Sequence, residues 1–277
     1  MNKRLILAIY LLGLAALVNC GCDCCDQCGV EEEEYIEPEG TCPALKRISS
    51  GLSGSCWASR YWDCCKPSCS WSDNAGWGNE ARECDTFMNV LSNKYTTSVC
   101  NGGSSTTCLS QIPFTLSGCD NIGFAFASVP GAGPKICGRC FVLEFTGYGK
   151  YETKLNHQKL KGKQLVVMAT NIGYDVDPGQ FDIMIPGGGV GLFNGCAPLF
   201  GSANMGQQYG GLLAECNDVK HAGDSVSCLK EACQTAFGSV PQALQGCLWS
   251  ATFLEAADNP NMTFEEIECP DVLKSKY

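Results

Sequence analysis

The sequence predicts a mainly β fold in which a few short helices lie on loops. Glycine is abundant, with 32 residues in a chain of 277, and charged residues make up only 17%. That composition favours a compact, turn-rich β fold over a helical bundle or a disordered chain. From about Cys56 onward, short apolar runs are separated by Gly, Pro, Asn and Ser. The length allows one large domain with a sizeable core, or one domain with a small appendage.

Four short runs rich in Val, Phe, Ile and Leu are bounded by turn residues, which predicts β-strands. They span residues 123–129, 140–145, 164–169 and 181–185. Residues 78–95 are a helix candidate because Phe87, Val90 and Leu91 lie at helical spacing. Residues 229–237 are a second helix candidate. The expected framework is therefore a set of strands with helices on the connections.

The N-terminus has the pattern of a secretory signal peptide, which we place at residues 1–20. Lys3 and Arg4 give it a basic start, and residues 5–18 form an uncharged apolar run. This run is too short to span a bilayer comfortably, and no later stretch approaches a membrane span. We therefore expect a secreted, extracellular protein that is free of the membrane once the signal is removed.

Cysteine is the strongest compositional signal, with 22 residues. Only two histidines are present, which makes zinc sites less attractive, although all-Cys sites stay open. Secretion favours a disulfide framework instead. Residues 21–50 begin with a cysteine cluster followed by four consecutive glutamates. We interpret them as a Cys-rich leader and acidic linker, with a small binding or metal module as the alternative, and residues 51–277 as the main domain.

The formal net charge of −10 excludes a nucleic acid or an anionic membrane surface as the natural partner and suits a neutral one such as a carbohydrate. No nucleophile elbow and no phosphate-binding glycine loop is present. His157 and His221 lie in polar stretches and are expected to be solvated loop residues. Cys137 and Cys140 could form a redox pair or half a zinc site, but in a secreted chain two structural half-cystines are favoured. No metal or cofactor is therefore expected.

Two carboxylates stand in unusual surroundings. Asp63 lies between Trp62 and the pair Cys64-Cys65, and Asp182 lies inside the apolar run 181–185. Burial of a carboxyl raises its pKa toward that of a general acid. Gly187, Gly188 and Gly189 follow, and their missing side chains would let a bulky polymer approach the backbone. Glycoside hydrolysis needs two carboxyls in opposite protonation states. The alternative is that Asp63 caps a turn and Asp182 is an outward strand residue.

Around these residues the chain resembles glycoside hydrolase family 45, the small inverting endoglucanases. The first matching motif is Ala58-Ser59-Arg60-Tyr61-Trp62-Asp63-Cys64-Cys65-Lys66-Pro67-Ser68-Cys69-Ser70-Trp71. The second runs from Phe181 to Cys196, and shorter matches follow at residues 257–260 and 267–270. Ser59 stands where the family has Thr, and Gln180 where it has His. A glutamine cannot titrate, so we expect an altered pH optimum with activity retained.

The resemblance implies a six-stranded double-psi β-barrel with long disulfide-tied loops and a substrate groove. It implies a monomeric endo-β-1,4-glucanase, a cellulase that cuts cellulose or related β-glucans with inversion. Asp63 would be the general base and Asp182 the general acid. Asp175 matches a third acidic position on a mobile loop, and Asp177 is close enough to compete for that role. The binding or assisting residues are then Tyr61, Trp71, Asp175, Gly187, Gly188 and Gly189.

The resemblance also implies the disulfide pairs. They are Cys64–Cys196, Cys65–Cys100, Cys69–Cys137, Cys84–Cys108, Cys140–Cys269 and Cys216–Cys247. Cys228 and Cys233, in the insertion between Cys216 and Cys247, are candidates to pair with each other. Cys42, Cys56 and Cys119 have no assigned partner.

Two rival classes stay open. Expansins resemble this barrel and loosen cell walls without hydrolysis, but they lack the base aspartate that Asp63 supplies here. A disulfide-rich defence or interaction protein on a barwin-like barrel would explain the cysteines but not the glycine-rich motif after Asp182. Sugar release from carboxymethylcellulose distinguishes the enzyme from both.

Overall fold

The described strands form a single sheet whose pairings return to their starting point. The computed structural model describes residues 42–130, 135–201, 203–218 and 224–277, which belong to one unit, Tyr35–Tyr277. The strands are β1 (Ser53–Tyr61), β2 (Phe114–Thr115), β3 (Ile122–Pro130), β4 (Cys140–Gly149), β5 (Gln164–Gly173), β6 (Gln180–Met184) and β7 (Pro260–Ile267). Their order is β2-β3-β5-β4-β7-β1-β6, and β3 also pairs with β6. Six strands therefore make a continuous circuit.

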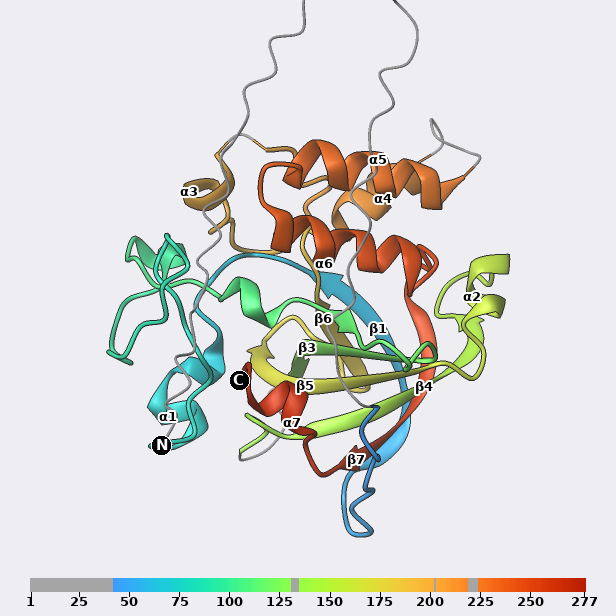
Figure 1. Ribbon diagram of the computed structural model, residues 1–277, viewed down its shortest axis with the longest axis horizontal. Coiled ribbons are helices and arrows are strands. Elements are labelled where there is room, and N and C mark those ends of the chain that lie inside the picture. The colour runs from blue at the N-terminus through green and yellow to red at the C-terminus, as the bar shows by residue number, and fades with distance from the viewer. Residues whose placement is uncertain (1–41, 131–134, 202, 219–223) are drawn as a thin grey trace, which may run out of the picture. The chain divides into compact units, whose positions relative to one another are not determined.

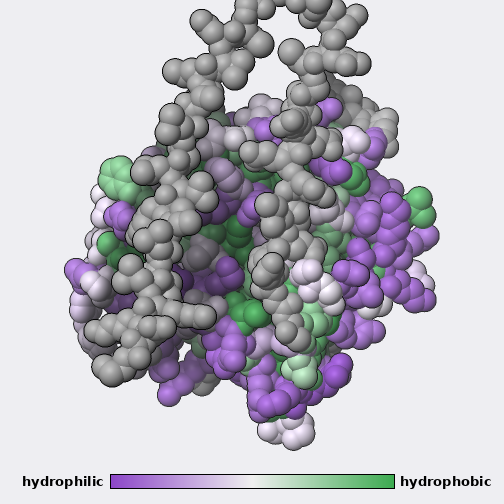
Figure 2. Space-filling model, viewed as in Figure 1, coloured by the Kyte–Doolittle hydropathy of each residue, from purple (hydrophilic) through white to green (hydrophobic). Residues whose placement is uncertain are grey.

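Helices lie on the connections between these strands and, in one case, after the last strand. They are α1 (Ser72–Ala75), α2 (Leu155–Lys159), α3 (Ala197–Phe200), α4 (Gly211–Asn217), α5 (Ser225–Phe237), α6 (Pro241–Thr252) and α7 (Asp271–Lys274). Short 3-10 turns occur at Ser68–Ser70, Val99–Asn101 and Leu109–Gln111. In Figure 1, α4, α5 and α6 gather above the strands, and α1 and α2 lie on opposite sides. Figure 2 shows a largely hydrophilic surface on the α2 side of the same view.

Strands β3, β4, β5 and β6 are buried on both faces over most of their length. In β4 and β5, Leu143 and Val167 belong to one core cluster, whereas their neighbours Val142 and Val166 belong to a second cluster that includes residues of α4, α5 and α6. Successive side chains of a strand point to opposite faces. Two buried faces therefore give continuous apolar runs in place of alternation, which is why these strands could be recognised in the sequence.

All four predicted strands are confirmed, with shifted or extended ends, as β3, β4, β5 and β6. Two long strands, β1 and β7, were not predicted. Both are partly exposed and carry Ser, Gly, Arg or Glu, so their composition is not typical of a strand. They are held by pairing, because β1 lies between β6 and β7 in the sheet.

One helix prediction is confirmed and one is wrong. Residues 229–237 lie within α5, which begins where the Asp224 side chain accepts hydrogen bonds from the backbone N–H of Val226 and Ser227. Residues 78–95 form turns and isolated bridges. There Asp85 accepts from the backbone N–H of Phe87 and Asn89, and these local bonds compete with helical ones.

The prediction of a solvated loop position for His157 is also wrong. Its ring is buried in α2, its Nδ1 accepts from the backbone N–H of Lys154, and its Nε2 lies 2.7 Å from the carbonyl of Asp258. His221, the signal peptide and the cysteine cluster of the leader lie outside the described residues. Within the described ranges, no helix combines the length and apolar character needed to cross a bilayer.

Candidate active site

A cleft of about 640 Å³ contains both carboxylates of the sequence motifs. Its walls come from β1, β5, β6 and the loops that follow them. Asp63, Asp182 and Asp175 all line it, together with Tyr61 and Trp71. Segments that are far apart in the sequence therefore meet at one site.

The pairing of β1 with β6 sets the positions of the two carboxylates. The strands are parallel, with Ser59 opposite Asp182 and Tyr61 opposite Met184. Because side chains alternate along a strand, Ser59 and Tyr61 share the face that lines the cleft. Asp63 follows two residues later on the same side, just beyond the end of β1.

Asp182 is held by a chain of hydrogen bonds. The Ser59 hydroxyl donates to Asp182 Oδ1 over 2.6 Å, and Gln180 Nε2 donates to the Ser59 oxygen over 2.6 Å. Gln180 Oε1 in turn accepts from the backbone N–H of Asp177 over 2.8 Å. Burial raises the pKa of Asp182 to about 7, with further raising by Asp175 and Asp63, against the lowering effect of Ser59 and Arg60. The carboxyl is thus about half protonated near neutral pH and largely protonated about one pH unit lower.

Asp63 is fixed by the backbone around it. The backbone N–H of Cys65 donates to Asp63 Oδ1 over 2.9 Å, and the N–H of Gly195 donates to the Asp63 carbonyl over 2.9 Å. Burial raises the pKa of Asp63 to about 6, while the Cys65 hydrogen bond lowers it. Asp63 therefore caps a turn, as the alternative interpretation expected, and also lines the cleft. Asp63 loses its proton at a lower pH than Asp182.

Tyr61 stands among three carboxylates. Its hydroxyl accepts from Asn171 Nδ2 over 3.1 Å. Burial and the charges of Asp63, Asp182 and Asp175 raise the pKa of Tyr61 well above its usual range, so it stays a neutral donor. Asp175 acts on all three groups, because it also raises the pKa of both other aspartates.

The structure separates Asp175 from Asp177. Asp175 lines the cleft, whereas Asp177 is absent from the described lining and offers its backbone N–H to Gln180. Of the two competing positions, Asp175 is the one that faces the cleft.

The glycine run has a different role from the one expected. A Cβ on Gly188 would lie 2.8 Å from the backbone nitrogen of Tyr61, and one on Gly189, at φ +102°, would lie 2.7 Å from the Gln208 carbonyl. A Cβ on Gly187 would lie 2.7 Å from Leu212. These glycines therefore make room for the protein's own chain, and of the three only Gly189 lines the described cleft.

Several lining residues were not predicted from the sequence. The aromatic ones are Trp57, Tyr151, Tyr174, Phe193 and Tyr209. Trp57 could have been found, since it precedes Ser59 and Tyr61 at a spacing of two. The others lie on loops, where nothing in the sequence distinguishes a cleft-facing ring from any other exposed one. Arg60 was also missed as a lining residue, and it forms an ion pair of 2.6 Å with Asp258.

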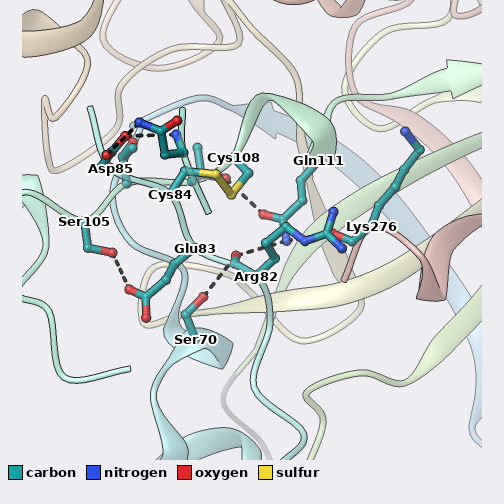
Figure 3. Close-up of a disulfide and its surroundings, with 12 residues drawn as sticks. Ser70, Arg82, Glu83, Cys84, Asp85, Ser105, Cys108, Gln111 and Lys276 are labelled. Atoms are coloured by element: carbon teal, nitrogen blue, oxygen red, sulfur yellow. Dashed lines mark hydrogen bonds between the residues drawn. A yellow bond between two sulfur atoms is a disulfide. The ribbon is translucent and has the colours of Figure 1, made fainter. Parts of the chain in front are cut away.

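Disulfides tie the segments of the site together. The structure forms Cys64–Cys196, Cys65–Cys100, Cys69–Cys137, Cys84–Cys108 and Cys140–Cys269, as expected, and also Cys42–Cys119. Cys56 is buried and has no partner among the described cysteines. Cys64–Cys196 joins the segment of Asp63 to the loop after Asp182. Figure 3 shows Cys84–Cys108, with Glu83 and Ser105 pointing toward each other beside it.

The expected pairs Cys216–Cys247 and Cys228–Cys233 are wrong. The structure forms Cys216–Cys228 and Cys233–Cys247. Cys228 and Cys233 lie five residues apart on α5, and at 3.6 residues per turn their side chains leave the helix in different directions. Cys228 therefore reaches α4 and Cys233 reaches α6.

The cleft has no evident metal centre. Across the part of the chain that the structure describes, no group of three or more His, Cys, Asp or Glu side chains could hold a metal ion. The cleft instead contains two carboxyls with different pKa values, Asp63 and Asp182, beside the neutral Tyr61. Such a pair can supply one acid and one base at the same pH.

Known proteins resemble this chain over most of its length. The family model of glycosyl hydrolase family 45 matches residues 55–276. Endoglucanase B of Cellvibrio japonicus is 41% identical over 240 residues, which are 83% of this chain and 46% of that protein. An endoglucanase of Cryptopygus antarcticus is 38% identical over 242 residues, which are 84% of this chain and 92% of that protein. The crystal structure of a cellulase from the same springtail has a TM-score of 0.65 at 35% identity, covering 81% of this chain and 96% of that one.

Proposed function

We propose, because this chain belongs to glycosyl hydrolase family 45, that it hydrolyses internal β-1,4-glucosidic bonds of cellulose or a related β-glucan. The relatives named above carry the names endoglucanase and cellulase. The observation that carries the proposal is one cleft with two partly buried carboxyls, whose pKa values are raised to about 6 and about 7.

In this mechanism Asp182 is the general acid and Asp63 the general base. Asp182 gives its proton to the glycosidic oxygen, and Asp63 takes a proton from the water that attacks the anomeric carbon from the opposite face. The order of the two pKa values supports this assignment, because the acid must hold its proton at a pH at which the base has lost its own. Ser59 and Gln180 orient the acid, and the backbone N–H of Cys65 orients the base.

Inversion of the anomeric carbon follows from this assignment. The water must fit between Asp63 and the sugar, so the two carboxyls should lie roughly 6.5–9.5 Å apart in the complex. We also propose that the circuit of six paired strands is a double-psi β-barrel. The protein would work as a secreted monomer on a polysaccharide, with no cofactor.

Release of reducing ends from carboxymethylcellulose, with loss of viscosity, tests the proposal. The wild type should release sugar, and Asp63→Asn and Asp182→Asn should each lower the rate by at least about 100-fold, the lower end of what acid–base catalysis contributes. The matched control is Asp177→Asn, which changes an aspartate of the neighbouring loop outside the described cleft lining and should keep most of the rate.

Two outcomes would contradict the proposal. Binding to cellulose without any release of sugar would favour the expansin-like alternative. Near-normal rates in Asp63→Asn would show that the base is wrongly assigned, even if hydrolysis itself occurs.

A further inference from the structure

Two large aromatic side chains stand exposed outside the cleft and contact each other. Trp77 is 74% exposed and Tyr95 is 65% exposed. Their ring centroids lie 6.0 Å apart and the rings meet edge to face, at 61°. The two residues come from different segments, so the contact is made by the fold. Neither ring lies in the core, and clustered exposed apolar groups of this kind mark interaction sites.

This pair is joined to the wall of the cleft through Trp71. Trp71 lines the cleft, and the short helix α1 separates it from Trp77. The four residues of α1 rise only about 6 Å. The Lys66 ammonium lies 3.5 Å from the centroid of the Trp71 ring. The same ammonium donates hydrogen bonds to the carbonyls of Lys94 and Thr96, over 2.8 and 3.1 Å. Lys66 therefore links the Trp71 ring to the backbone on both sides of Tyr95.

The support of Tyr95 is well fixed. Lys66 and Glu83 form a fully buried ion pair of 2.9 Å, and Glu83 also accepts a hydrogen bond from Ser105 (Figure 3). The disulfide Cys84–Cys108 ties the same segment down. A surface that is already ordered loses little conformational entropy when a ligand binds.

The geometry points to a single chain of β-1,4-glucan as the ligand. An aromatic face is apolar and suits the CH-lined face of a glucose unit, while the Trp N–H and Tyr O–H at the ring edges can hydrogen-bond its hydroxyls. Two rings at 61° cannot both lie flat on a crystalline cellulose surface. We propose that Trp77 stacks a glucose unit of a chain leaving the cleft past Trp71, with Tyr95 bracing the Trp77 ring. This inference rests on the proposed function.

The test compares a long substrate with a short one. For each variant, kcat/KM is measured on soluble hydroxyethyl cellulose and on cellotetraose, and the ratio of the two is taken. Trp77→Ala should lower this ratio by about 5- to 10-fold, the scale of one stacked ring. Phe87→Ala is the matched control, since Phe87 is 84% exposed and belongs to the same loop region. Its ratio should stay at the wild-type value.

An unchanged ratio in Trp77→Ala would overturn the inference, and so would an equal loss on both substrates, which indicates damage to the cleft. If Trp77→Ala lost only its binding to crystalline cellulose, the assignment of this surface to single chains would be refuted. If the wild type cleaves neither substrate, the proposed function fails. Retardation in native gels containing hydroxyethyl cellulose then still tests the surface, because Trp77→Ala should migrate faster than the wild type.

Discussion

Asp182→Asn should make the folded protein more stable at pH 8 and leave its stability at pH 4 almost unchanged. The pKa of Asp182 rises from 3.8 to about 7 on folding, chiefly because the carboxyl is buried. The folded state then holds the proton more tightly than the unfolded state. Wild-type stability is therefore highest below pH 3.8 as far as this group is concerned, and is lost as the pH rises toward 7.

The shift sets the size of the effect. About three pKa units at 1.36 kcal/mol each give at most about 4 kcal/mol of unfolding free energy above pH 7. For a domain of this size, that corresponds to a rise in Tm of roughly 8–16 °C. Asparagine keeps an oxygen that can accept the Ser59 hydroxyl, so little else should change. Asp63→Asn should gain less, about 3 kcal/mol, because its pKa is raised only to about 6.

The assay is thermal unfolding of both variants and the wild type at pH 4 and pH 8, followed by circular dichroism. The gain in Tm should appear at pH 8 and be larger for Asp182→Asn. Equal shifts at the two pH values would refute the reasoning, since they would show that ionisation of the buried carboxyls costs no stability.

Three further results are expected. The pH profile of kcat/KM should be a bell with limbs near pH 6 and 7, from ionised Asp63 and protonated Asp182, and a rate that keeps rising above pH 8 would contradict it. Ser59→Ala removes a bond that favours ionised Asp182, so the alkaline limb should move to higher pH, and a downward shift would count against the bond. Replacing Cys64 and Cys196 by Ser opens a link between residues 132 apart and should lower the unfolding free energy in urea by 2 to 5 kcal/mol, whereas no loss would show that the link is redundant.

Much of the sheet could be predicted from the sequence, because four strands are buried on both faces and read as apolar runs. The helix α6 could not. Its sequence contains Gly246, which lowers helix propensity, yet a Cβ there would lie 2.9 Å from Pro186. Close packing against the turn after Asp182 requires that glycine, and only the tertiary structure makes the reason visible.

The motifs identified the residues at the centre of the cleft better than those at its edges. Asp63 and Asp182 lie in long signatures, and both line the cleft. The resemblance implied a bond from Cys216 to Cys247 across the insertion, but the structure pairs each of these two with a cysteine of the insertion. The packing of α4, α5 and α6 determines those pairs, because Cys228 of α5 faces α4 and Cys233 of α5 faces α6.

In the proposed mechanism, Asp182 donates the proton while Asp63 activates water on the opposite face of the sugar. Proton NMR of the first product released from a β-1,4-linked oligosaccharide tests it most directly. The α anomer should appear first and convert slowly to the equilibrium mixture, because inversion changes the configuration once. Appearance of the β anomer first would mean that a carboxylate attacks the sugar, and it would contradict the roles assigned to Asp63 and Asp182.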